Sequence, residues 1–209
     1  MGERLSKLDI QVHPLDLPES RCSRQFYEFC QRVCDPCLLE FEYSHNCRAF
    51  DRIQVKYPDW QLTILGEGSM RSELEQLRSQ LQLTDRVHLP GLVTNVQEYL
   101  HQAALFVMPS RFEGFPMALC EVMACGLPTI AADCLSAPRE SVEDGVNGLL
   151  VATEDVDALA AGFDALMSDP AKRQQLAQNA LQILDRFGVE HVIAIWAEAI
   201  DRVMAWKRR

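Results

Sequence analysis

From residue 60 onward the chain alternates short apolar runs with longer amphipathic segments, and this alternation restricts the fold more than any other feature. The run at 60–66 (WQLTILG) has the pattern of a buried strand. The segment at 69–83 follows it, with Leu74, Leu77 and Leu81 spaced as on one face of a helix. Strands and helices in such alternation predict an α/β fold, in which a Rossmann-like parallel sheet is flanked by helices.

The same two patterns, apolar runs and amphipathic segments, predict the other strands and helices of the chain. The predicted strands are 86–91, 104–110, 128–132 and 147–151. The predicted helices are 95–102, 116–125, a short turn at 138–144, and three C-terminal helices at 155–168, 170–186 and 189–206. Ser69 is the expected N-cap of the helix at 69–83, and Pro170 lies in the first turn of its helix. Parallel sheets of this kind bind ligands at the carboxyl ends of their strands.

Residues 1–48 do not follow this alternation. They mix aromatic and charged side chains without a clear period, and the first strand that the α/β layout requires is not visible there. We therefore expect an irregular segment at 1–48 and one ligand-binding α/β domain, with its C-terminal helices, at 49–209.

The charge and the first residues of the chain exclude several classes of protein. The net charge of −10 argues against nucleic acid as a partner, because binding to phosphate backbones needs a basic surface. Residues 1–20 contain acids and prolines but no apolar core of a secretory signal. The longest apolar stretch is interrupted by Pro116, Gly126 and Pro128. We expect a cytoplasmic chain, peripheral to a membrane only through a partner or substrate.

Five of the eight cysteines lie between residues 22 and 47, which raises the question of a metal site. Cys30, Cys34 and Cys37 have the spacing of an iron–sulfur motif, and Cys34 and Cys37 could form a zinc site with His45 and Cys47. Only the spacing supports either site, so free thiols, or an artefact of the sequence, are the preferred interpretation. We expect neither a metal nor a cofactor. The remaining cysteines are interpreted as small core residues, and they are Cys120, Cys125 and Cys134.

The stretch RFEGFPMALCEVMACGLPTIAAD at 111–133 has one charged side chain between Gly114 and Ala132, that of Glu121. Its apolar neighbours predict a buried helix, in which an unpaired carboxylate is costly. Glu121 is then a core acid satisfied by its neighbours, an acid at a helix edge that reaches solvent, or a carboxylate held dry to accept two hydrogen bonds from a sugar diol. We favour the diol, because the surroundings are apolar.

A second acid, Glu113, stands in the loop just before this helix. The loop follows the end of a strand and precedes a helix N-terminus, where free backbone amides and the helix dipole favour a phosphate. Gly114 allows a ligand to approach the backbone closely. The turn LGEG at 65–68 is a second glycine-rich connection of the same kind, and it lacks the Gly-Lys-Ser/Thr of a Walker A loop.

Taken together, these segments resemble the donor-binding C-terminal domain of family 4 retaining glycosyltransferases, which is the C-terminal half of a GT-B fold. The resemblance runs from about Ala49 to Val151 and centres on the E-x7-E motif formed by Glu113 and Glu121. The segments PSRFEGFP, EVMACGLP and EDGVNGLLV around this motif make the match specific.

The resemblance implies roles for individual residues. Glu113 would face the hydroxyls of the donor sugar and stabilise charge on the transferred sugar, and Glu121 would bind the ribose hydroxyls of the nucleotide. Backbone amides would approach the sugar and diphosphate, and they belong to Gly114, Phe115, Met117 and Ala118. The nucleotide cleft would be lined by Gly66 and Gly68, and the loop with Leu92 and Val93 would meet the base. No metal is implied.

The sequence also departs from the family pattern. Ala137 stands where the subgroup with Ser-Gly-Pro-Arg-Glu has glycine, and that subgroup often uses UDP-hexoses. The Gly-Arg and Lys-Gly elements that neutralise the donor diphosphate are not found between Ser20 and Ala49. Of the N-terminal acceptor domain only IQVHPLDLPES is present, which resembles the inter-domain linker. Our hypothesis is that residues 21–48 are misread or degenerate, and translation of the other two reading frames tests it.

The expected function is transfer of a hexosyl group from a nucleotide sugar, of which a UDP-sugar is preferred, to a glycan or lipid-linked acceptor with retention. The chain alone is expected to be incomplete and weakly active or inactive, and its acceptor domain could be a separate chain. The alternative is a non-catalytic or degenerate nucleotide-binding half-enzyme that needs such a partner.

Overall fold

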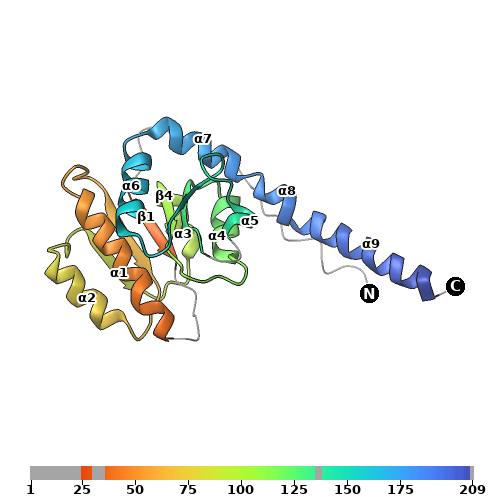
Figure 1. Ribbon diagram of the computed structural model, residues 1–209, viewed down its shortest axis with the longest axis horizontal. Helices are drawn as coiled ribbons and strands as arrows, with labels where there is room; N and C mark the ends of the chain where they lie inside the picture. The colour runs from red at the N-terminus through yellow and green to blue at the C-terminus, as the bar shows by residue number, and fades with distance from the viewer. Residues whose placement is uncertain (1–24, 30–35, 135–137, 208–209) are drawn as a thin grey trace.

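The computed structural model describes residues 25–29, 36–134 and 138–207 and has a parallel sheet between two layers of helices (Figure 1). In this described part the sheet has six strands in the order β3-β2-β1-β4-β5-β6, and every neighbouring pair is parallel. The strands are β1 (Gln25–Phe29), β2 (Gln61–Leu65), β3 (Val87–Gly91), β4 (Leu105–Met108), β5 (Thr129–Ala132) and β6 (Leu149–Val151). The predicted α/β fold is confirmed.

The helices follow the strands along the chain. They are α1 (Pro36–Ile53), α2 (Arg71–Gln80), α3 (Val96–Gln102), α4 (Met117–Ala124), α5 (Pro138–Ser141), α6 (Val156–Met167), α7 (Pro170–Ala180), α8 (Ile183–Phe187) and α9 (Val189–Lys207). Because successive side chains of a strand point to opposite faces, each strand supplies both layers of the core. In β4, Leu105 and Val107 pack with α1 and α6, whereas Phe106 and Met108 pack with α3 and α4.

Two local predictions were wrong. Met70, not Ser69, is the N-cap of α2, and no side chain caps this helix. The helix expected at 170–186 is two helices, α7 and α8, separated at Leu181 and Gln182. The N-cap of α7 is Asp169, whose carboxylate accepts a hydrogen bond of 2.9 Å from the backbone N–H of Lys172.

The larger difference concerns residues 1–48, which the sequence pattern describes as irregular. Residues 25–29 form β1, which lies in the middle of the sheet between β2 and β4. Helix α1 begins at Pro36 and continues to Ile53, so the expected boundary at residue 49 falls inside a helix. The pattern missed β1 because QFYEF places a glutamate within a strand that has a neighbour on both sides. The hypothesis of a misread or degenerate segment also concerns 21–24 and 30–35, outside the described residues.

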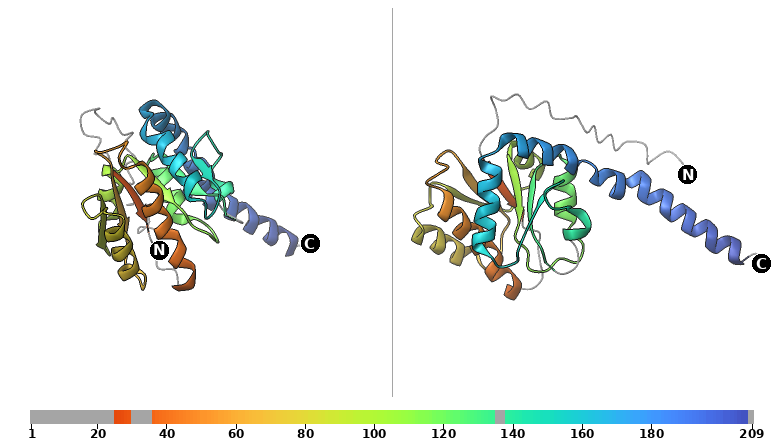
Figure 2. Two further views of the ribbon diagram at one scale, coloured as in Figure 1. Left: turned by 60° about the vertical axis from the view of Figure 1, so that its left-hand side comes forward. Right: turned by 45° about the horizontal axis from the view of Figure 1, so that its top comes forward.

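The last helix, α9, extends away from the rest of the molecule (Figures 1 and 2). It follows α8 through Gly188, whose extended backbone interrupts the helical path. Among the described residues, no helix has both the length and the apolar character needed to cross a membrane.

Candidate donor-binding site

The strand order reverses between β1 and β4, and this reversal marks the expected ligand position in a sheet of this type. From β1 the chain continues outward through β2 to β3, and from β4 outward through β5 to β6. Open parallel sheets bind ligands outside the carboxyl ends of the strands at such a point. The loop at 109–116 follows β4 here, and the turn at 66–70 follows β2 on the other side of β1.

Glu113 lies half-buried in the loop after β4, which contacts neighbouring elements on both sides of this residue. On one side, Arg111 forms an ion pair with Glu154 from the loop after β6, with 3.1 Å between Nε and Oε1. On the other side, the ring of Phe115 meets the ring of Phe187 in α8 edge to face, with 5.2 Å between centroids. These contacts restrain the loop that carries the candidate catalytic carboxylate.

Glu121 occupies the exposed face of α4, so the expectation of a buried carboxylate was wrong. Leu119, Val122 and Met123 turn toward the sheet and are buried. Because a helix has about 3.6 residues per turn, Glu121 falls on the opposite side, together with Met117, which is 57% exposed. Glu121 therefore needs no buried partner, and its carboxylate is accessible to a ligand.

The first turn of α4 offers fewer backbone donors than the sequence suggests. The N-cap Pro116 has no N–H, and the N–H of Met117 already donates to the carbonyl oxygen of Phe115 at 2.9 Å. The amide of Ala118, in the same turn, has no acceptor within its own helix. Gly114 is exposed, and a Cβ added there would meet no atom within 4 Å, so a ligand can approach its backbone.

The glycine-rich turn after β2 is joined to the end of β3. Gly66 has a φ of 129°, which favours glycine, and its N–H donates to the carbonyl oxygen of Gly91 at 2.9 Å. Gly91 also has a positive φ of 81°. A Cβ at Gly91 would lie 2.7 Å from Oε2 of Glu67, so glycine leaves the space that the Glu67 carboxylate occupies.

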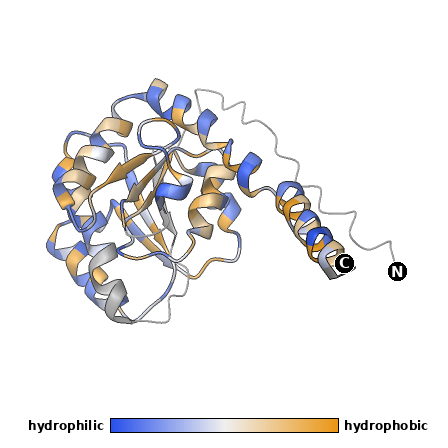
Figure 3. Ribbon diagram, turned by 45° about the vertical axis from the view of Figure 1, so that its right-hand side comes forward, coloured by the Kyte–Doolittle hydropathy of each residue, from blue (hydrophilic) through white to orange (hydrophobic). Residues whose placement is uncertain are grey.

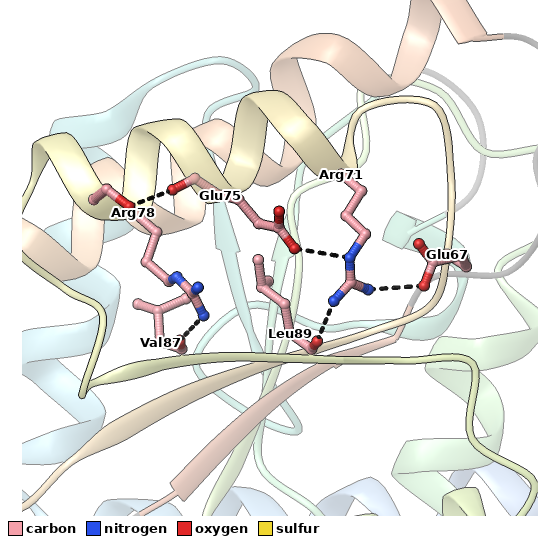
Figure 4. A network of polar contacts seen from close by, with 7 residues as sticks. Glu67, Arg71, Glu75, Arg78, Val87 and Leu89 are labelled. Atoms are coloured by element: carbon pink, nitrogen blue, oxygen red, sulfur yellow. Dashed lines mark hydrogen bonds and ion pairs between the residues drawn. The ribbon is translucent and has the colours of Figure 1, made fainter.

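Arg71, in the first turn of α2, connects this turn to both the helix and β3 (Figure 4). Its guanidinium donates to Glu67 at 2.7 Å, to Glu75 at 2.9 Å and to the carbonyl oxygen of Leu89 at 2.9 Å. The two carboxylates raise the pKa of Arg71. The motifs of the sequence do not mark Arg71 as part of the site, although Glu67, Arg71 and Glu75 have i,i+4 spacing.

The two residues predicted to meet the base differ in exposure. Leu92 is 68% exposed, whereas Val93 is half-buried and packs against the core beside α4. Gly68 in the neighbouring turn is exposed. The predicted site residues thus lie on the loops that follow β2, β3 and β4 and on helix α4, at the carboxyl ends of these strands.

Comparison with known proteins gives the family. Residues 42–183 match the family described as Glycosyl transferases group 1. The chain belongs to this family. Its relatives include the lipopolysaccharide core biosynthesis mannosyltransferase LpsB of Rhizobium meliloti, which is 33% identical over 153 residues, or 70% of this chain and 42% of LpsB. The lipopolysaccharide 1,6-galactosyltransferase of Salmonella typhimurium is 32% identical over 141 residues, or 65% of this chain and 39% of that enzyme.

Solved structures show the same fold. The C-terminal domain of a glycosyl transferase group 1 protein, LpcC from Francisella tularensis, superposes with a TM-score of 0.70 at 24% identity. The match covers 81% of this chain and 93% of that domain. HepE from Anabaena, solved with UDP and glucose, has a TM-score of 0.73 at 24% identity over 86% of this chain and 48% of HepE. This group 1 glycosyltransferase chain spans less than half the length of the curated relatives named above.

The four cysteines whose side chains the structure describes lie in or beside the core of this chain. Cys47 and Cys134 are buried. Cys120 in α4 and Cys125 at its C-cap are half-buried and pack against the core. Burial raises the pKa of Cys120 and Cys125, and the charge of Glu121 raises both further. No group of three or more potential metal-binding side chains occurs among the described residues. Cys30 and Cys34 lie outside the described residues, as does the side chain of Cys37.

Proposed function

We propose that this chain binds the nucleotide-sugar donor of a retaining, metal-independent glycosyltransferase of family 4. The donor is a UDP-hexose, and the acceptor is a glycan or a lipid-linked glycan. The observation that carries the proposal is the placement of Glu113 and Glu121 on the loop and helix that follow β4, where the strand order reverses. Both carboxylates thus belong to the edge at which parallel sheets bind nucleotides.

The accessible carboxylate of Glu121 suits a ribose diol. A carboxylate has two acceptor oxygens, so it can accept one hydrogen bond from each of two neighbouring hydroxyls. Hydrogen bonds to a charged group are stronger than neutral ones. Binding of the nucleotide would then remove Glu121 from water, and the apolar neighbour Met117 would become covered at the same time.

The diphosphate and the sugar would lie at the N-terminal end of α4. The positive end of the helix dipole and the amide of Ala118 favour the diphosphate. Glu113 would lie beside the sugar, where its carboxylate stabilises positive charge that develops on the transferred hexosyl group. Two of the basic side chains described at this edge already pair with carboxylates, Arg111 with Glu154 and Arg139 with Asp133. Additional basic groups would have to come from outside the described residues or from a partner chain.

The names of relatives support the choice of donor and acceptor. Two relatives are named for transfer of galactose or mannose in lipopolysaccharide synthesis, and HepE was solved with UDP and glucose. Acceptor recognition is assigned in our proposal to an N-terminal acceptor domain, carried elsewhere in the protein or on a separate chain.

A binding titration with UDP, GDP and their hexose conjugates tests the nucleotide site. We expect UDP to bind more tightly than GDP, and Glu121→Ala to weaken UDP binding about 10- to 100-fold, since two charged hydrogen bonds are lost. Glu198→Ala is the matched control, because Glu198 is also an exposed glutamate in an apolar-rich helix, α9. Unchanged UDP affinity in Glu121→Ala would contradict the proposed role.

The role of Glu113 is tested by comparing the affinity for UDP with the affinity for the UDP-hexose. Glu113→Gln should leave the affinity for UDP unchanged and weaken the affinity for the UDP-hexose, because Glu113 is assigned to the sugar. With an acceptor domain supplied, the same variant should lose transfer activity. If the wild-type chain supports transfer at a normal rate by itself, the assignment of acceptor recognition to another domain is wrong.

A further inference from the structure

The loop between β4 and α4 carries Glu113 and is attached to the rest of the molecule two positions before and two positions after this residue. The residues next to Glu113 give the loop little support, because Phe112 is 62% exposed and a Cβ at Gly114 would meet no atom within 4 Å. Arg111 and Phe115 instead contact elements that are distant in sequence. The position of the Glu113 carboxylate therefore depends on what holds these two side chains.

Glu154 holds the first of the two points, and its backbone has an unfavourable conformation. Its Oε1 atom lies 3.1 Å from Nε of Arg111. Its φ of 60° falls in the left-handed region, where a Cβ crowds the following carbonyl oxygen, so that glycine is favoured. Among the described residues other than glycine, only Gln82 shares this conformation, and Gln82 ends helix α2, where it is common. Glu154 has no such explanation, and strain of this kind indicates that its side chain is needed.

The segment that carries Glu154 is fixed on both sides. It follows β6, which pairs with β5 in the sheet. Asp155 is the N-cap of α6, and its carboxylate accepts a hydrogen bond of 2.9 Å from the backbone N–H of Ala158. Helix α6 then packs against the sheet with Leu159 and Phe163 buried. A firmly placed carboxylate is thus presented to the loop after β4.

Phe187 holds the second point. Its ring meets the ring of Phe115 edge to face, with 5.2 Å between centroids. The guanidinium carbon of Arg186 lies 5.1 Å from the centroid of Phe187, and Arg186 donates to the carbonyl oxygen of Glu140 in α5. Ile183, in the same helix, is the last buried residue of the described chain. Helix α9 beyond it exposes both its hydrophobic and its hydrophilic residues (Figure 3), so α8 is the last helix anchored to the domain.

We propose, building on the proposed function of Glu113, that Glu154 and Phe187 are positioning residues for the donor sugar. Glu154 acts through Arg111, and Phe187 acts through Phe115. Together they hold the loop so that the Glu113 carboxylate already faces the sugar when the donor binds. A carboxylate that stabilises developing charge is effective only if it is held in place before the reaction, because reorienting it costs free energy.

Hydrogen exchange of the backbone amides of residues 110–115 measures the order of the loop without any ligand. Glu154→Gln should speed this exchange about two- to fivefold, as expected for loss of a partly exposed ion pair. Phe187→Ala should speed it about three- to tenfold, because an aromatic pair is lost. Glu143→Gln, at an exposed glutamate, and Leu184→Ala, at an exposed leucine of α8, are the matched controls and should leave the exchange unchanged.

The affinities for UDP, UDP-glucose and UDP-galactose test whether the order of the loop serves the sugar. Glu154→Gln and Phe187→Ala should bind UDP like the parent chain, and should bind the preferred UDP-hexose more weakly by the factors given for exchange. Arg111→Glu and Glu154→Arg should each weaken UDP-hexose binding alone. Combined in one chain, the two changes exchange the charges of the ion pair and should restore the affinity of the parent.

Glu154→Gly separates positioning from stability. Glycine adopts a φ of 60° without strain, so the melting temperature should not fall. The affinity for the UDP-hexose should nevertheless fall as far as in Glu154→Gln, because both variants lack the carboxylate that holds Arg111. A residue that served stability alone would not separate the two measurements in this way.

Two results would overturn the proposal and leave the proposed function intact. One is unchanged exchange of the loop amides in Glu154→Gln or in Phe187→Ala. The other is unchanged UDP-hexose affinity in these variants when Glu113→Gln has lost it. If Glu113→Gln itself binds the UDP-hexose like the parent chain, the proposed function of Glu113 is wrong, and Glu154 and Phe187 have no sugar contact to position.

Discussion

Helices α4 and α9 are both rich in apolar residues and both carry a glutamate near the middle, but they have opposite surroundings. In α4 the apolar face packs on the sheet through Leu119, Val122 and Met123, and only the side with Glu121 is exposed. In α9 the apolar face itself is exposed, with Trp196 at 65%. An amphipathic pattern therefore indicates that a face will be covered, but only the elements opposite the helix decide what covers it.

The largest expected contrast concerns stability. Leu119→Ala should lower the free energy of unfolding by about 2–5 kcal/mol, because it removes buried methyl groups and leaves a cavity. Ile200→Ala, a similar truncation in α9, should change it by less than about 0.5 kcal/mol, because Ile200 is exposed. Urea unfolding of both variants measures the difference. Equal losses would mean that α9 packs on its own chain in solution.

A second contrast concerns the Gly66–Gly68 turn, which lies at the same end of the sheet as α4. If this turn takes part in nucleotide binding, Arg71→Ala should weaken UDP binding about three- to tenfold. The variant removes the hydrogen bonds by which Arg71 in α2 holds Glu67 of the turn and the carbonyl oxygen of Leu89 in β3. Arg78→Ala is the matched control in the same helix, where Arg78 donates to the carbonyl oxygen of Val87 at 3.2 Å, away from the turn (Figure 4). If both arginine variants bind UDP like the parent chain, the turn has no part in the site.

The smallest expected effect is on the thiols of α4 and its C-cap. Burial raises the pKa of Cys120 and Cys125, so their alkylation should need a higher pH than that of an exposed cysteine. The negative charge of Glu121 disfavours both thiolates, so Glu121→Gln should lower the two pKa values. At a fixed pH below both pKa values, alkylation of the two thiols should then be about two- to threefold faster.

Glu198→Gln in α9 is the control for this measurement, because it removes the same charge without neighbouring α4. Mass spectrometry of partially alkylated protein gives the rate for each cysteine. Identical rates in Glu121→Gln and the parent would contradict the electrostatic influence of Glu121 on its helix.

The sequence predicted most elements because their signals are local. Alternating apolar runs and helical leucine spacing placed strands β2 to β6 and helices α2 to α6 within a few residues. The E-x7-E spacing placed Glu113 in a loop and Glu121 in a helix, as the structure has them. Contacts distant in sequence gave no such signal. The hydrogen bonds between Gly66 and Gly91 and between Arg71 and Leu89 depend on the pairing of β2 with β3, so no local pattern in the sequence predicts them.

The sequence by itself determined the class of fold, the family and the two candidate carboxylates, because periodicity and motif spacing are properties of neighbouring residues. Tertiary structure alone decided three other features. β1 took its place between β2 and β4 through backbone hydrogen bonds to both. Glu121 lies on the exposed face of α4 because Leu119, Val122 and Met123 pack on the sheet. The apolar side chains of α9 stayed exposed because no described element lies opposite them, and burial requires a surface to pack against.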